Sequence, residues 1–240
     1  MKRNLAFEWV RASTLRSTWG FPLLGIGLAS VATVMFLVSG GSPDGGAPQA
    51  TVGELLGNTA NVGIVFTTVI CAQAFGHEYR DGTMRLVLSE FPARSRVFLA
   101  KLVVPGLIVA VSVLVASAII TVLGLSMSDS GAGTSAAGLL EIVGRQVVAA
   151  VWWGLMVAAI TALLRNLAAG IVFALVLSTI VETLLSSLLG SRLSWLDDVL
   201  PFTSAMRWAS GGGIGQGITA LVWVVALVGA AWTGFLRRDA

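Results

Sequence analysis

The chain has 240 residues, of which 56% are hydrophobic and 11% are charged, and its formal net charge is +3. Soluble domains carry about 25% charged and 45–50% apolar residues, so this composition excludes an ordinary soluble domain and indicates an integral membrane protein. There is a single cysteine, Cys71, and a single histidine, His77, so neither an internal disulfide nor a structural metal site is expected.

The first 19 residues form a mixed segment ahead of the first apolar run. Apolar residues such as Leu5 and Trp9 recur at helical spacing, and Glu8 and Arg11 form an i,i+3 pair on the polar face. This pattern predicts that residues 1–19 form a helix lying in the membrane interface. Ordinary juxtamembrane anchoring residues are the alternative.

Six apolar runs are long enough to cross a bilayer, which takes about 20 residues. They predict an all-α integral membrane protein with one transmembrane domain over residues 1–240, and the spans are residues 21–40, 57–76, 102–125, 143–164, 167–189 and 216–236. The loops between them leave no room for a soluble catalytic domain of about 100 residues. No catalytic residue and no bound cofactor are predicted, and an energy-converting domain would have to lie on another chain.

The basic residues predict the orientation, since Lys and Arg in short loops are retained on the cytoplasmic side. An even number of spans places both termini on one side, which then holds twelve of the fifteen basic residues; Arg145, Arg192 and Arg207 fall opposite. Both termini are therefore predicted to be cytoplasmic, in a bacterial plasma membrane. The positive net charge follows from this topology, and no nucleic-acid partner is expected.

Residues 77–101, between the second and third spans, form a dense charged loop at the cytoplasmic face. Gly82 and Pro92 break this loop, and basic residues restart the chain after Pro92. Its centre is an apolar ridge that could fit a groove of a soluble partner, made of Thr83, Met84, Leu86, Val87 and Leu88. The alternative is a loop that only fixes topology, although its three carboxylates exceed that need.

Ionisable residues inside membrane spans are candidates for functional sites. Glu182 has no partner nearby in the sequence, and it either contacts substrate or lines a pathway, or it pairs with an outer-loop arginine such as Arg192 or Arg207. Four aromatic residues either contact an apolar compound in a pathway or pack in the core and against lipid: Trp152, Trp153, Phe173 and Trp223.

Residues 190–215, between the fifth and sixth spans, are too many and too apolar for a solvated turn. Pro201 divides them, and apolar residues recur at roughly helical spacing around it. This pattern predicts two short outer helices, forming an outer helical hairpin that caps a pathway. A membrane-surface lid without a gating role is the alternative.

The motif HEYRDGT after the second span, a Leu-rich segment, then Pro-Ala-Arg and Ala-Lys at the third span resemble the membrane subunits of type-2 ABC exporters. The similarity covers most of the chain. It implies that two permeases work with two copies of a separate ATPase, which bind ATP and Mg. The absence of a G-x-x-x-x-G-K-[ST] motif fits ATP hydrolysis on another chain. The resemblance also implies a cytoplasmic coupling helix that contacts the ATPase, with the coupling residues His77, Glu78, Tyr79, Arg80, Asp81, Gly82, Thr83, Arg94 and Lys101.

The function that this resemblance implies is ATP-driven export by alternating access, and the chain is then not an enzyme by itself. A pathway of Val, Leu, Phe, Trp and Ala with almost no charge favours a hydrophobic or amphipathic cargo, as in multidrug efflux or antibiotic resistance. An exporter of lipid or glycan precursors is one alternative, and a non-transporting membrane anchor that recruits a soluble partner is another. The permease could pair with itself or with a related chain.

Overall fold

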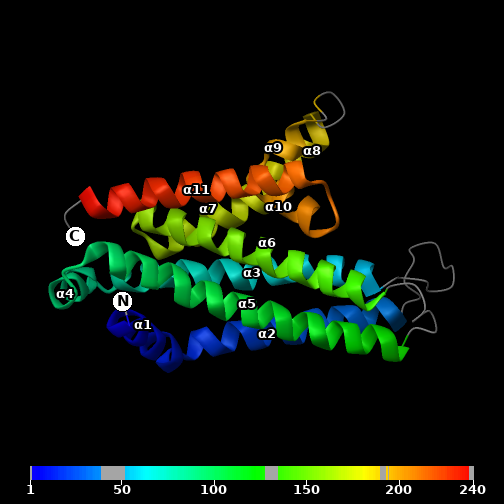
Figure 1. The fold of residues 1–240 in the computed structure, drawn as a ribbon, viewed down its shortest axis with the longest axis horizontal. Coiled ribbons are helices and arrows are strands. Elements are labelled where there is room, and N and C mark those ends of the chain that lie inside the picture. Colours follow the sequence, from blue (N-terminus) through cyan, green and yellow to red (C-terminus); the bar gives the residue numbers. More distant parts are fainter. Residues whose placement is uncertain (1, 39–51, 128–134, 190–192, 194, 238–240) are drawn as a thin grey trace.

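The computed structural model describes residues 2–38, 52–127, 135–189, 193 and 195–237, and these residues form helices and turns but no strand. Figure 1 shows an elongated bundle in which the long helices run along the longest axis. The predicted all-α architecture is confirmed. In chain order the elements are α1 (Lys2–Thr14), α2 (Arg16–Val38), α3 (Val52–Arg80), α4 (Met84–Glu90), α5 (Arg94–Met127), α6 (Ala136–Leu164), α7 (Leu167–Leu175), the π-helix η1 (Val176–Val181), α8 (Glu182–Leu189), α9 (Leu196–Val199), α10 (Pro201–Ala209) and α11 (Ile214–Arg237).

Five helical stretches in the described part of the chain are long and apolar enough to cross a membrane. They are α2, α5, α6, the continuous stretch Leu167–Leu189 that contains α7, η1 and α8, and α11. The sixth predicted span, residues 57–76, belongs to α3, which is not among these five. Because α3 contacts α2, α5, α6 and α7, it runs through the middle of the bundle.

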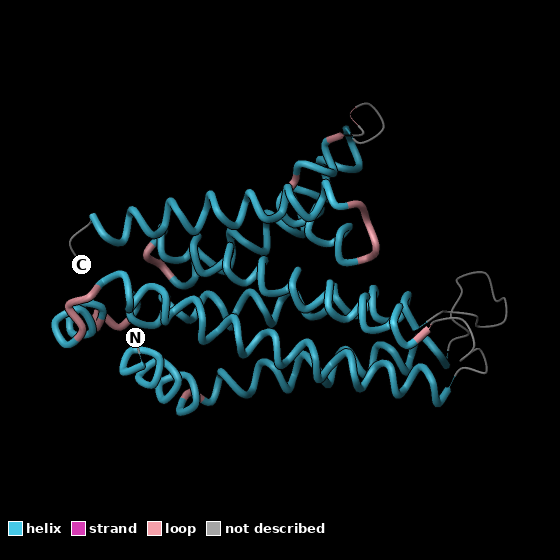
Figure 2. Tube along the Cα trace, viewed as in Figure 1, coloured by secondary structure: helices cyan, strands magenta, loops and turns pink. Residues whose placement is uncertain are grey.

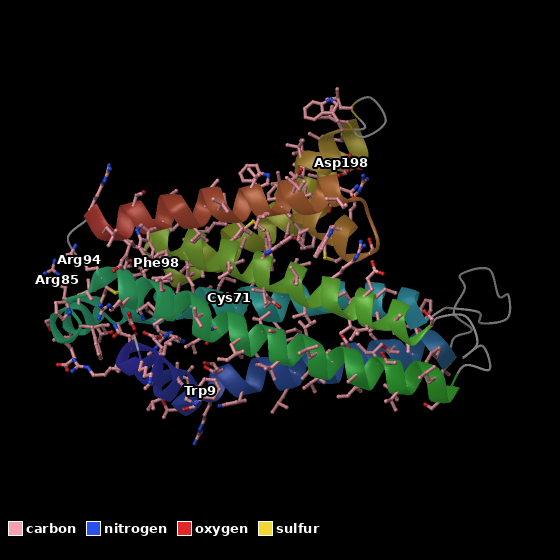
Figure 3. All side chains as sticks on the ribbon, in the orientation of Figure 1. Trp9, Cys71, Arg85, Arg94, Phe98 and Asp198 are labelled. Carbon is pink, nitrogen blue, oxygen red and sulfur yellow. The ribbon has the colours of Figure 1, made fainter. Side chains whose placement is uncertain are left out.

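Both chain termini and the short helix α4 lie at the same end of the bundle, as Figures 1 and 2 show. Figure 3 places Arg85 and Arg94 at this end and Asp198, in α9, far from it. The segment 190–215 contains the two short helices α9 and α10, and its residues 190–192 and 194 lie outside the described residues. The charged loop and the hairpin segment are therefore separated by most of the length of the bundle.

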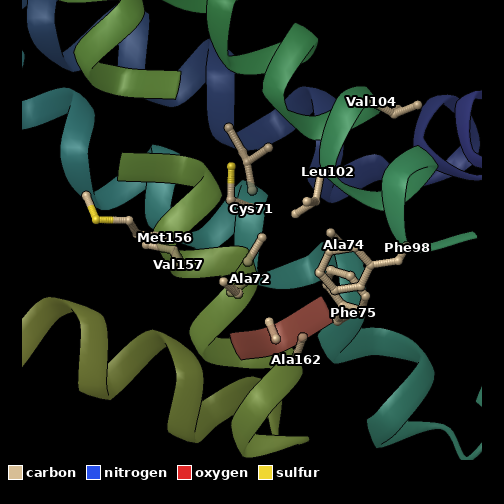
Figure 4. Packing of buried hydrophobic residues seen from close by; sticks show 14 of the residues in the cluster. Cys71, Ala72, Ala74, Phe75, Phe98, Leu102, Val104, Met156, Val157 and Ala162 are labelled. Atoms are coloured by element: carbon tan, nitrogen blue, oxygen red, sulfur yellow. The ribbon is translucent and has the colours of Figure 1, made fainter. Parts of the chain in front are cut away.

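Aromatic rings build the core next to α4. Phe75 of α3 and Phe98 of α5 have ring centroids 5.3 Å apart, and Phe235 of α11 lies 5.9 Å from the first and 5.5 Å from the second. Figure 4 shows Phe75 and Phe98 side by side in the buried cluster. Aromatic pairs at such distances add to the free energy of apolar burial. They fix α3, α5 and α11 to one another at this end.

Helices α3 and α6 approach each other closely at Gly154, where an added Cβ atom would lie 2.6 Å from Sγ of Cys71. We expect Gly154→Ala to lower the melting temperature of the purified protein, because overpacking a core costs about 1–3 kcal/mol. Gly144→Ala in the same helix is the control, since nothing lies within 4 Å of its added Cβ atom. Equal melting temperatures for the two variants would contradict this packing.

Candidate functional site

A buried cluster of charges joins three helices at the end of the bundle that carries α4. Lys101 of α5 is fully buried, with a side-chain exposure of 0%, and its Nζ atom lies 2.8 Å from Oε1 of Glu8 in α1. The same ammonium group pairs with Oε1 of Glu78 in α3 and donates a hydrogen bond to the carbonyl oxygen of Ala74 at 3.2 Å. One lysine therefore connects α1, α3 and α5.

Arg11 completes this ionic cluster, which we define as Glu8, Arg11, Glu78 and Lys101. The Arg11 guanidinium donates to Oε2 of Glu8 at 2.9 Å and to the carbonyl of Ala74 at 3.2 Å, and it lies 3.7 Å from Oε1 of Glu78. The cluster contains two cations and two anions, so its formal charge is zero. Charges that are buried in a protein need such pairing, because an uncompensated one is strongly destabilising.

The structure places two of the predicted coupling residues, Glu78 and Lys101, inside the protein. Their side chains have almost no surface to offer to a partner, so any part they play in coupling acts through the helices that they join. The i,i+3 pair of Glu8 and Arg11 is present. The pairing of Lys101 with Glu8 was missed by sequence reasoning, because only the packing of α1 against α5 brings the two residues together.

The turn after α3 and one side of α4 form part of the exposed surface at this end. Arg80 and Asp81 are exposed and pair with each other at 2.9 Å. Gly82 has a φ of 68°, a left-handed conformation that glycine adopts without a steric penalty. On α4 the side chain of Leu86 is 68% exposed. The turn and α4 thus offer an exposed ion pair, a tight turn and, from α4, the apolar side chain of Leu86 among polar residues.

The predicted apolar ridge is wrong in part. Met84 is buried, and Val87 and Leu88 pack against the hydrophobic core. A short amphipathic helix that lies against a bundle buries one face and exposes the other. The apolar residues of α4 therefore belong mainly to the core, and Leu86 is the one that projects outward. Thr83 is half-buried and directly precedes α4.

Helix α1 supports α4 from the side. The rings of Phe7 and Phe91 lie 5.2 Å apart, and the Arg3 guanidinium lies 4.9 Å from the centroid of the Phe91 ring. Arg3 also reaches a carboxylate oxygen of Glu90 at 3.5 Å. Because this ion pair is exposed and contributes little, the aromatic contact provides most of the support. α1 is thereby attached both to α4 and, through the ionic cluster, to α3 and α5.

The predicted coupling residue His77 lies half-buried in the last turn of α3. Burial, and then the nearby cations of Arg80 and Arg11, lower the pKa of its imidazole below the usual value, so His77 is neutral at pH 7. The buried Nε2 atom of His77 has no hydrogen-bond partner within the described ranges. Nor do the described residues contain a group of three His, Cys, Asp or Glu side chains that could hold a metal ion.

The remaining two predicted coupling residues face other parts of the protein. The Tyr79 ring packs against the core, and the Arg165 guanidinium lies 5.9 Å from its centroid. Arg94 donates a hydrogen bond to the carbonyl of Leu236 in α11 at 3.4 Å. The exposed residues among the nine predicted coupling residues are thus Arg80, Asp81 and Gly82, and the other six are buried or half-buried.

Glu182 lies in the other half of the bundle, next to α10, and is 1% exposed. Its carboxylate accepts hydrogen bonds from the backbone N–H of Phe202 at 3.0 Å, from the backbone N–H of Thr203 at 2.7 Å and from the Thr203 hydroxyl at 2.8 Å. The first N–H groups of a helix lack partners within the helix and favour a negative charge. Glu182 therefore caps α10 and fixes it against α8.

The alternative in which Glu182 pairs with Arg207 is wrong. Arg207 pairs with Asp197 and, at 3.5 Å, with Asp198. Arg192, the other predicted partner, lies outside the described residues. The helix cap occupies both oxygens of the Glu182 carboxylate, so contact between this carboxylate and a substrate would require α10 to move.

The four aromatic residues predicted for a pathway do not share one surface. Trp153 is buried and lines a cavity inside the bundle. Trp152 stacks on Trp208 of α10 with ring centroids 5.0 Å apart. Phe173 is exposed on α7, and Trp223 of α11 donates a hydrogen bond to a backbone carbonyl of α9 at 2.8 Å. Only Trp153 among the four is therefore placed to contact a molecule in that cavity.

A comparison of the sequence with models of known protein families identifies the family of this chain. The model of the ABC-2 family transporter protein matches residues 19–185, which is more than half of the chain. This range runs from α2 into α8 and includes α4, Glu78 and Lys101. None of the curated proteins matches the sequence significantly. The match over most of the helical bundle shows that the chain belongs to the ABC-2 transporter family.

Proposed function

We propose that this chain is the permease subunit of an ATP-driven exporter, which moves a hydrophobic or amphipathic compound, such as a drug, an antibiotic or a similar natural product, out of the cell. Membership of the ABC-2 transporter family supports the permease role. The chain itself then hydrolyses nothing, and ATP and Mg bind to a separate ATPase subunit. Two permeases, identical or related, and two ATPases form the complex, which works by alternating access.

Six membrane spans follow when α3 is counted with the other five. α3 has 29 residues, and at 1.5 Å per residue it is about 43 Å long, which is enough to cross a bilayer. An even number of spans agrees with the position of both termini at the α4 end (Figure 2). Because most of the basic residues fall on that side, it is the cytoplasmic side in this proposal, where an ATPase can reach α4.

The proposed coupling mechanism depends on the ionic cluster. Glu78 lies two residues before the exposed Arg80, and the cluster joins α3 to α1 and α5 at the end of the bundle that carries α4. Removing one partner from a buried ion pair costs about 3–5 kcal/mol, so these three helices resist separation at this point. A force that an ATPase applies to α4 would therefore move α1, α3 and α5 together, and would reach the centre of the bundle.

Leu86→Asp tests whether an ATPase docks on α4. Because Leu86 is an exposed apolar side chain on this helix, we expect the charged variant to reduce co-purification of the ATPase about tenfold, which corresponds to about 1.4 kcal/mol of binding free energy. Membrane insertion should not change. Leu236→Asp is the control, since Leu236 is also exposed at this end but lies on α11. Undiminished co-purification with Leu86→Asp would argue against docking on α4.

A further inference from the structure

A cavity of about 100 Å³ lies near the middle of the long helices, between α2, α3, α5, α6 and α10. Small residues form much of its wall, among them Gly25, Ala29 and Ala149. The rings of Trp153 and Phe202, with centroids 5.2 Å apart, form another part. The lining contributed by the described residues contains no Asp, Glu, Lys or Arg. The cavity is therefore apolar in character and carries no formal charge.

Three polar side chains line this wall in addition to its apolar residues: Thr67 of α3, Ser117 of α5 and Gln146 of α6. Their exposed fractions are only 6%, 3% and 8%. A fourth lining residue, Ser112, is satisfied by the carbonyl of Ile108 at 2.6 Å. The hydroxyl groups of Thr and Ser and the amide group of Gln can each donate and accept hydrogen bonds. The three groups therefore have hydrogen-bonding capacity to offer to a bound molecule.

The lining selects the chemical class of that molecule. A charged group would enter the cavity without a counter-ion and would be strongly disfavoured. Small-molecule sites typically combine apolar walls with a few polar groups that fix orientation. Apolar cavities of about 150 Å³ hold a benzene-sized molecule, so a cavity of about 100 Å³ suits a small ring or a short branched chain. The Gln146 amide can both donate and accept a hydrogen bond, so it suits a hydroxyl, carbonyl or amide on the ligand.

We propose that this cavity is a binding site, within a single subunit, for a neutral and mainly apolar molecule that carries a hydrogen-bonding group. The Gln146 amide binds that group with help from Thr67 and Ser117, and the apolar part of the molecule lies against Trp153. Identification of the ligand as exported cargo rests on the proposed function. Binding itself requires no ATPase, so the binding site and the proposed export function can be tested separately.

Photolabelling of the purified full chain tests the site, with a short branched alcohol that carries a diazirine as the probe. We expect labelling of residues 112–120 and 146–153 that an excess of the plain alcohol competes away. Gln146→Leu keeps the approximate volume and removes the amide, so it should weaken this competition about fivefold, the effect of one hydrogen bond of about 1 kcal/mol. Ala149→Phe fills the cavity and should remove the competed labelling. Val148→Phe is the control, because Val148 is exposed on the same helix.

Competed labelling that survives Ala149→Phe, or labelling confined to exposed side chains, would overturn the proposal. Size-exclusion chromatography establishes that each variant is folded, and Gln146→Leu decides the outcome if Ala149→Phe does not fold. Competition by added phospholipid as strong as that by the alcohol would identify a membrane lipid as the occupant and overturn its assignment as cargo. Competed labelling in a chain that binds no ATPase would support the site and count against the proposed function.

Discussion

Lys101→Ala is expected to be the most damaging single substitution at the α4 end of the bundle. It removes the fully buried cation that pairs with both Glu8 and Glu78, and leaves these two carboxylates with the partly exposed Arg11 as the remaining cation of the cluster. Loss of one partner from a buried ion pair costs about 3–5 kcal/mol, a large part of the roughly 5–15 kcal/mol that stabilises a typical domain. We expect the variant to aggregate or unfold after detergent extraction, as measured by size-exclusion chromatography and thermal unfolding.

Two further variants test whether the loss of stability comes from the buried charges left without Lys101 and not from the loss of any lysine. Lys2→Ala removes an exposed lysine from α1 and should leave the melting temperature unchanged. Lys101→Met combined with Glu78→Gln removes one charge of each sign, so it should recover part of the stability that Lys101→Ala loses. A melting temperature for Lys101→Ala equal to that of the parent protein would show that the ionic cluster does not hold α1, α3 and α5 together.

Glu182→Ala is expected to release α10 from α8. The substitution leaves the backbone N–H groups of Phe202 and Thr203 without their acceptor. Loss of a helix N-terminal cap costs about 0.5–2 kcal/mol, and each donor that stays buried and unpaired adds about 1–3 kcal/mol. We expect faster hydrogen exchange of the backbone amides of α10, measured by mass spectrometry, together with a lower melting temperature.

Glu182→Gln should retain part of this stability, because its amide oxygen can still accept a hydrogen bond. Glu141→Ala is the control for the loss of a carboxylate, since Glu141 forms only an exposed ion pair with Arg145 at 2.6 Å. If α10 exchanges its amide hydrogens at the same rate in Glu182→Ala and in the parent protein, the carboxylate does not hold α10 in place.

Features that depend on residues close together in the sequence could be predicted from the sequence. Apolar runs predicted most of the spanning helices, because a lipid-facing helix must be apolar over its own length. The pair of Glu8 with Arg11 was predictable because residues three apart share one face of a helix. The same reasoning led to the two short helices around Pro201, because proline restricts the chain locally.

The partners of the buried charges could not be predicted in this way. Lys101 is 93 residues from Glu8, and Glu182 is 20 residues from Phe202. Contacts over such separations depend on how whole helices pack, which hydropathy does not encode. The sequence does offer one signal for the ionic cluster, because Glu78 and Lys101 lie next to predicted span boundaries and Glu8 lies in the predicted interfacial helix, so the packing of helix ends can bury them.

In the charged loop, too, the sequence alone does not predict which residues are buried and which are exposed, even within one helical turn. α3 continues through Arg80, and residues two apart on a helix point in directions about 200° apart. Glu78 therefore faces the interior and Arg80 faces solvent, although both belong to one charged motif. The motif predicted a functional region, but the division into an exposed surface and a buried cluster required the orientation of the helix.

The claim that this chain couples ATP hydrolysis on another subunit to export is tested most directly by co-purification. The tagged chain would be extracted from its native membrane in mild detergent, and the bound proteins identified by mass spectrometry. We predict an ABC ATPase in about equal amount, with ATP hydrolysis that is retained in the parent complex and reduced about tenfold in the Leu86→Asp preparation. Recovery of the chain with no ATPase and no nucleotide hydrolysis would contradict this claim and would favour a membrane anchor for a different soluble partner.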